Sequence, residues 1–99
     1  MALSEFRYNK KRKHYAYLFK ELGTKVKNIV FTSKQYRKYR DDYRKNIKLH
    51  THPNPNSNKE IYVIPYVYVD EKTSFNEKKL NWRFDKHDKR KIKRIKKRY

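Results

Sequence analysis

Three clusters of lysine and arginine are the side chains with the clearest chemistry in this sequence. They occupy residues 10–13, 37–45 and 89–98. Lysine and arginine bind phosphate oxygens, and each phosphate that they neutralise releases condensed counterions, which supplies affinity for nucleic acid. The clusters therefore predict a nucleic-acid-binding surface. Its predicted phosphate-binding residues are Lys10, Lys11, Arg12, Lys13, Arg37, Lys38, Arg40, Arg44, Lys89, Arg90, Lys93, Arg94 and Lys97.

Tyrosines form a second candidate binding feature. Tyr62, Tyr66 and Tyr68 alternate along an apolar segment, so in a strand they share one face. Exposed there, they would stack on unpaired bases, and we predict them as nucleic-acid-binding residues that favour RNA over DNA. The alternative is that the rings pack beneath helices with their hydroxyls at the rim. No RNP-type motif is present, so the sequence does not indicate an RNA-recognition-motif domain.

A His-x-His-Pro segment, residues 50–53, is a candidate metal site because two imidazoles can bind Zn²⁺. The segment resembles the metal-binding segment of JAMM-type metalloproteases. The resemblance is partial, since Ser57 comes early and Glu60 stands where that family has an aspartate. A catalytic zinc also needs a third protein ligand and a general base. We therefore interpret His50 and His52 as part of an ordinary polar loop, and we expect no metal or other cofactor.

Metal-independent RNA cleavage is an alternative function, because it needs only a base, an acid and cations that stabilise the phosphorane. The sequence carries no ribonuclease signature, but a small basic endoribonuclease of the toxin–antitoxin kind, masked by an acidic partner, fits its charge. Histidines from elsewhere in the chain, His14, His50 or His52, could contribute. The candidate catalytic residues of this alternative are His87, Arg90, Arg94 and Tyr99.

The charge balance indicates a polyanionic partner. The chain has 99 residues, with 29 Lys+Arg against 10 Asp+Glu and a formal net charge of +19. Folding brings these like charges together at a cost that an anionic partner removes. We therefore expect a small basic nucleic-acid-binding protein. A basic adaptor that binds an acidic protein is a further alternative.

Composition also excludes several classes of protein. The single glycine, Gly23, leaves no glycine-rich phosphate loop, and the absence of cysteine excludes disulfides and thiolate metal sites. No segment has the roughly 20 apolar residues of a membrane span. Residues 1–13 lack the apolar stretch of a secretory signal. We therefore expect a cytoplasmic protein.

The first half of the chain is expected to contain an arm, a hairpin and a helix. Residues 1–13 are polar and end in a basic run, which indicates an N-terminal arm outside the domain. Residues 14–32 alternate and are rich in aromatic and β-branched residues, which predicts a β-hairpin whose loop places Gly23 at positive φ. Ser33 can cap a central helix over residues 34–45, with tyrosines recurring at positions 36, 39 and 43.

In the second half, residues 61–69 alternate as an edge strand interrupted by Pro65, with Ile61, Val63, Val67 and Val69 facing the core. Trp82 and Phe84 suggest a short strand. Asp85 can cap a basic helix over residues 86–98, whose apolar stripe is Ile92, Ile95 and Tyr99. The sequence thus predicts one small α+β domain over residues 14–99, with an antiparallel sheet, one central helix and a basic C-terminal helix.

Overall fold

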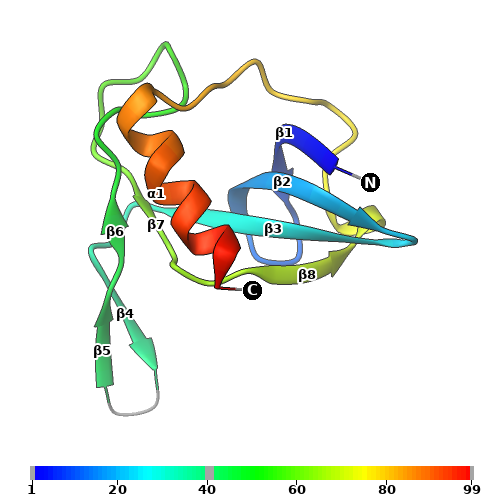
Figure 1. Ribbon diagram of the computed structural model, residues 1–99, viewed down its shortest axis with the longest axis horizontal. Helices are drawn as coiled ribbons and strands as arrows, with labels where there is room; N and C mark the ends of the chain where they lie inside the picture. Colours follow the sequence, from blue (N-terminus) through cyan, green and yellow to red (C-terminus); the bar gives the residue numbers. More distant parts are fainter. Residues whose placement is uncertain (1, 40–41, 99) are drawn as a thin grey trace.

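The computed structural model describes residues 2–39 and 42–98, without the side chains of residues 39, 42 and 43. Its fold is α+β, as predicted. The larger sheet is antiparallel and has the strand order β1-β2-β3-β7-β6, with β8 also paired to β3 (Figure 1). Its strands are β1 (Ala2–Asn9), β2 (His14–Leu22), β3 (Lys25–Thr32), β6 (Ile47–Lys48), β7 (Tyr62–Val63) and β8 (Tyr68–Glu71). The other elements are β4 (Tyr36–Tyr39), β5 (Asp42–Lys45), the 3-10 turn η1 (Lys72–Ser74) and the helix α1 (Lys86–Lys97).

The predicted hairpin over residues 14–32 is confirmed as β2 and β3. Leu22 pairs with Lys25 across the turn, and Gly23 has the positive φ, 62°, that the short loop requires. β3 lies inside the sheet, and both of its faces are covered: Ile29 and Phe31 belong to one core cluster, and Val30 to another. This double burial explains the continuous apolar run in β3.

The prediction that residues 1–13 form an arm outside the domain is wrong, because β1 is an edge strand of the sheet. Tyr8 pairs with Tyr15 of β2, and Phe6 is buried. The Phe6 ring lies 5.1 Å from Tyr17 and 5.0 Å from Phe84, measured between centroids. Burial of that one ring outweighs the polar composition of the segment. The basic run at 10–13 forms the tight turn between β1 and β2.

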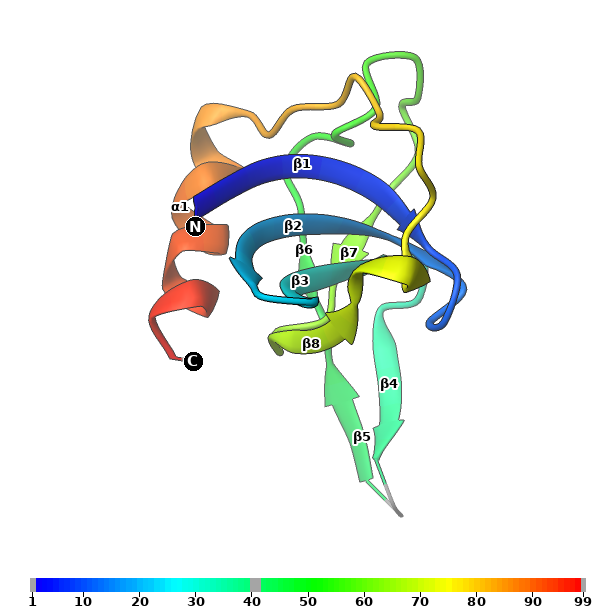
Figure 2. The same cartoon turned by 90° about the vertical axis from the view of Figure 1, so that its right-hand side faces the viewer.

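The predicted central helix over residues 34–45 is also wrong, because the segment forms the hairpin β4–β5. In a helix, Arg37, Arg40 and Arg44 would have lain on one face at like-charge spacing, and tyrosine favours strands. Arg40 itself lies outside the described residues. Asn46 closes the base of the hairpin: its N–H donates to Gln35 O (2.8 Å) and its Nδ2 to Lys34 O (3.0 Å). The hairpin projects away from the body in both views (Figures 1 and 2), and we call it the basic finger, residues 34–45.

The predicted strand over residues 61–69 is divided in two at Pro65. β7 and β8 both pair with β3, Val63 with Phe31 and Tyr68 with Asn28. The Ile64 N–H still donates to Val30 O at 3.0 Å, and residues 65–67 leave the ladder. The interruption at Pro65 agrees with the prediction, because proline donates no ladder hydrogen bond, but the predicted edge position is wrong for β7, which lies between β3 and β6. Val63 and Val67 are buried, whereas Val69 is 43% exposed and not part of the core.

The basic C-terminal helix is confirmed as α1. Asp85 caps it by accepting a hydrogen bond from the Asp88 N–H at 2.8 Å. Ile92 and Ile95 are buried in a core cluster that includes Phe31 and Phe84, so α1 packs on one face of the curved sheet (Figure 2). Phe84 reaches this core from an extended segment that is not a strand. The predicted third member of the stripe, Tyr99, lies outside the described residues.

Candidate nucleic-acid interface

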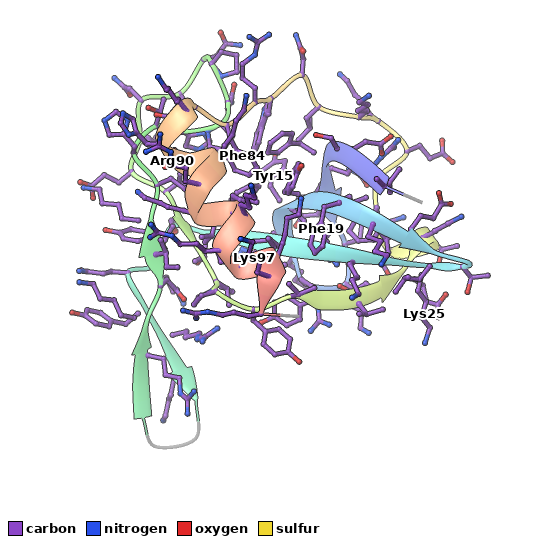
Figure 3. All side chains as sticks on the ribbon, in the orientation of Figure 1. Tyr15, Phe19, Lys25, Phe84, Arg90 and Lys97 are labelled. Carbon is purple, nitrogen blue, oxygen red and sulfur yellow. The ribbon has the colours of Figure 1, made fainter. Side chains whose placement is uncertain are left out.

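α1 presents an almost uninterrupted cationic face to solvent. Its buried seam is formed by Ile92, Ile95 and Asp88, and the remaining helix surface carries lysine and arginine. Figure 3 shows Arg90 and Lys97 towards opposite ends of this helix. In the described part of α1, only Lys91 forms an ion pair with a described carboxylate, that of Asp88 at 3.5 Å. The predicted phosphate-binding residues of the helix are all exposed: Lys89, Arg90, Lys93, Arg94 and Lys97.

Two neighbouring grooves flank α1, and every charged side chain that lines them is a lysine or arginine. The larger, about 470 Å³, runs between α1 and strands β1 and β2. We call it the α1 groove; Phe6, Tyr17, Ser4, Phe84 and Ile92 line it together with the cations Arg83, Lys89, Lys93 and Lys96. The second, about 430 Å³, shares Lys96 with it and adds Ala2, Phe19, Lys20 and Lys27. A cavity elsewhere is lined by a mixture of both signs, including Glu5, Glu21 and Glu77.

Most carboxylates of the described residues are held by cations outside the α1 groove. A polyanion in that groove would therefore meet uncompensated positive charge, in a hollow with low-dielectric walls that focus the field. The ion pairs are Glu5 with Arg7, Glu21 with Lys72, Glu60 with Lys48, Asp70 with Arg12, Glu71 with Lys25 and Asp88 with Lys91. Asp85 is bound by His50 Nδ1 at 2.7 Å.

An aromatic ledge adjoins the α1 groove. Tyr15 is 43% exposed, and its ring centroid lies 4.8 Å from that of Trp82 and 5.2 Å from that of Tyr8. Trp82 in turn lies 6.1 Å from Phe6 of the groove and directly precedes Arg83. We call Tyr8, Tyr15 and Trp82 the aromatic ledge. Such rings can stack on unpaired bases while the phosphates follow the adjacent cations.

The predicted tyrosine set is divided by the fold. Tyr62 is only 8% exposed, so its prediction as a stacking surface is wrong. Tyr66 is 44% exposed, and its ring centroid lies 4.8 Å from that of Tyr68. Tyr68 packs against the core cluster of Leu18, away from α1. Tyr66 therefore remains a candidate contact, at a distance from the aromatic ledge.

Arg12 is bound within the protein. Its guanidinium pairs with Asp70 at 2.8 Å and stacks 4.1 Å above the Tyr68 ring. The Asp70 side chain is fully buried and also accepts hydrogen bonds from Asn9 and Asn28. Burial favours a higher pKa, but the hydrogen bonds from Arg12, Asn28 and Asn9 and the Arg12 charge outweigh it and hold the pKa of Asp70 below its usual value.

Sequence reasoning missed this polar network, in which Arg12 has a structural role. Three exposed lysines of the predicted N-terminal cluster remain around it: Lys10, Lys11 and Lys13. Lys11 Nζ also lies 3.6 Å from Asp70. The turn between β1 and β2 therefore contributes fewer independent cations than its sequence suggests.

The basic finger places like charges directly opposite each other. Arg37 pairs with Arg44 across β4 and β5, and such a pair destabilises a hairpin. Replacing Arg37 with Glu should therefore stabilise the protein by about 0.2–1 kcal/mol. If Arg37 contacts one phosphate of a bound single-stranded RNA, the same change should weaken that binding at least about 5-fold near 0.1 M salt, because the contact is lost. Urea denaturation and fluorescence anisotropy measure the two effects, with Arg37→Gln as the neutral control. If stability and affinity both rise or both fall, the result contradicts this role of the finger.

The histidines do not converge on a metal. His52 Nδ1 accepts the Asn54 N–H at 3.0 Å, and its ring packs against Trp82 at 5.6 Å. Burial lowers the pKa of His52. Across residues 2–39 and 42–98, no group of three or more histidine, aspartate or glutamate side chains is arranged to hold a metal ion.

His50 instead meets His87, one of the residues predicted for the ribonuclease alternative. Their ring centroids are 4.8 Å apart, and His50 Nδ1 lies 2.7 Å from Asp85 Oδ2. The hydrogen bond from Thr51, followed by those from the Asp88 N–H and His50, holds the pKa of Asp85 well below its usual range. His14 lies elsewhere, on β2, where burial and the charge of Lys34 lower its pKa.

Sequence reasoning missed Arg83, Lys96 and Lys20 as groove residues. Lys96 carries a usable signal, because it lies three and seven residues beyond Lys93 and Lys89, on the same helix face. Lys20 carries none, since the fold brings it to α1 from β2, and Arg83 stands alone in the extended segment just before α1, without a pattern that marks it. The helix face was therefore predictable, but its partners across the grooves were not.

Comparison with known proteins gives no further guide to the site: no protein-family model, curated protein or solved structure matches this chain. Within the part of the chain that the structure describes, no helix has the length and apolarity needed to cross a membrane.

Proposed function

We propose that this protein binds single-stranded RNA in the cytoplasm, with phosphates along the α1 groove and bases against the aromatic ledge. The observation that carries the proposal is that Arg83, Lys89, Lys93 and Lys96 line the groove without a single acidic neighbour in its wall. Phosphates neutralise this charge and release counterions. The basic finger and the exposed lysines of the β1–β2 turn extend the positive surface.

RNA with unpaired bases is favoured over duplex DNA because the rings of the aromatic ledge can stack on bases that are not already stacked in a duplex. Tyr15 and Trp82 offer ring faces beside the groove, and single-stranded loops splay their bases onto such aromatic side chains. A duplex keeps its bases stacked on one another, so it offers no free base face to these rings. Single-stranded RNA therefore uses both the charge and the aromatic surface, whereas an acidic polypeptide uses the charge alone.

The experiment that tests the proposal compares wild type with Tyr15→Ala by fluorescence anisotropy on labelled single-stranded RNA. Loss of one stacked base should cost about 1–3 kcal/mol of binding free energy. Affinity for duplex RNA should stay unchanged, and Val69→Ala, which truncates an exposed side chain of β8 outside both grooves and the aromatic ledge, serves as the control. If polyglutamate of equal charge displaces the RNA as well as unlabelled RNA does, the protein is a basic adaptor for acidic proteins.

A further inference from the structure

Two imidazole rings lie side by side where α1 begins. His50 comes from the loop after β6 and His87 from the first turn of α1, and their ring centroids are 4.8 Å apart with 53° between the ring planes. Both residues are exposed, and the His50 side chain retains 62% of its accessible surface. The fold thus joins two imidazoles, a side chain that serves as general base or general acid, at a place that solvent and ligand can reach.

Asp85 fixes the orientation of the first ring. His50 Nδ1 lies 2.7 Å from Asp85 Oδ2, so the Nδ1–H donates to the carboxylate, and in the neutral ring the lone pair is then on Nε2. The backbone beneath the ring is held as well, because Asp88 accepts hydrogen bonds from the N–H groups of His50 (2.8 Å) and Thr51 (3.1 Å). An aligned imidazole with a free Nε2 is the geometry of a general base.

The contacts that hold the start of α1 against the loop after β6 explain only part of this arrangement. Asp85, Asp88 and Thr51 suffice to cap the first turn and tie it to the loop. They do not require a second imidazole on the helix. His87 adds an exposed ring beside the aligned one, and Arg90 follows one turn later on the same helix. The group therefore holds a base, an acid and a cation next to the cationic face of α1.

We propose that His50 and His87 cleave an RNA strand that passes from the α1 groove over the start of α1, an inference that rests on the proposed function. His50 Nε2 takes the proton of a ribose 2′-OH, and the 2′ oxygen forms a bond to the adjacent phosphorus. The bond from phosphorus to the 5′ oxygen breaks, and protonated His87 gives its proton to that leaving oxygen. Arg90 stabilises the charge of the phosphorane. The products are a 2′,3′-cyclic phosphate and a 5′-hydroxyl, and water returns the two rings to their starting protonation.

The test uses a pool of randomised RNA, so that base preference cannot hide cleavage, in the presence of a chelator. Wild type should produce fragments that end in a 2′,3′-cyclic phosphate, whereas 2′-deoxy strands of the same sequences stay intact. His50→Asn keeps a donor for Asp85 but removes the titrating ring, and His87→Gln removes the acid. Each should slow cleavage about 10²- to 10⁴-fold with RNA affinity within a factor of two. His14→Asn, purified in the same way, is the control and should cleave as wild type does.

The outcomes separate the two proposals. RNA that is bound but stays intact overturns the cleavage inference and leaves the binding function standing. Cleavage at the wild-type rate by both His50→Asn and His87→Gln also overturns it, since the activity then arises elsewhere. A protein that binds no RNA overturns both.

Discussion

Replacing Lys89, Lys93 and Lys96 together with glutamine is expected to lower the affinity for single-stranded RNA about 100-fold at 0.1 M salt, because each lost phosphate contact removes roughly 0.7 from the salt slope of log K. The three side chains are exposed and line the α1 groove. Their replacement should leave stability within about 0.5 kcal/mol per site. Deleting α1 cannot replace this test, because Ile92 and Ile95 are in the core.

The matched control for net charge is the triple variant Lys25→Gln, Lys48→Gln and Lys72→Gln. It loses the same charge, but these lysines pair with Glu71, Glu60 and Glu21. Lys25 also lies at the far end of the β2–β3 hairpin from α1 (Figure 3). Its RNA affinity should fall only a few-fold. Equal losses in the two variants would mean that total charge, and not the groove, determines binding.

Replacing Asp70 with alanine should destabilise the protein by about 3–5 kcal/mol, because it leaves two buried amides and one half-buried guanidinium without their shared acceptor. Those partners are the Arg12 guanidinium and the side-chain amides of Asn9 and Asn28. A small domain has only about 5–15 kcal/mol of stability, so much of it would be lost. Urea denaturation measures the change. The control is Glu71→Ala, whose exposed pair with Lys25 should contribute less than about 1 kcal/mol.

The same carboxylate gives the stability a definite dependence on pH. The pKa of Asp70 is lower in the folded state than in the unfolded chain, so the folded state binds its proton less readily. Its contribution is fully present above the unfolded pKa of about 3.9 and is lost as pH falls through the lower folded pKa. Wild type should therefore lose more stability on acidification than Asp70→Asn does. Equal losses would contradict the account of this network.

The sequence predicted those elements whose signals are local. Gly23 sets the β2–β3 turn, and Asp85 with the spacing of Ile92 and Ile95 sets α1. The helix prediction for residues 34–45 was wrong because the tyrosine spacing there also fits a helix. The pairing of Arg37 with Arg44 appears only in the folded hairpin. A helix there would have needed an apolar partner surface, which a sequence does not specify.

The candidate site was predictable to the same extent. The exposed cations of α1 follow from its buried seam, but the α1 groove depends on Arg83 and on strands β1 and β2, which reach it from other parts of the chain. Tyr62 and Tyr66 have similar sequence surroundings, but the fold buries the first and exposes the second. Asp85 was predicted as a cap, and its contact with His50 depends on the loop that the fold brings to it.

The central claim is that the cations beside α1 are arranged to meet phosphates, and the salt dependence of RNA affinity tests it most directly. If the four cations of the α1 groove, Lys20 and Arg37 of the basic finger each contact one phosphate of a single strand, log K should fall linearly with log salt, with a slope of about −4. Fluorescence anisotropy between about 50 and 200 mM salt gives this slope. A slope near zero, or no binding of RNA at all, would contradict the account.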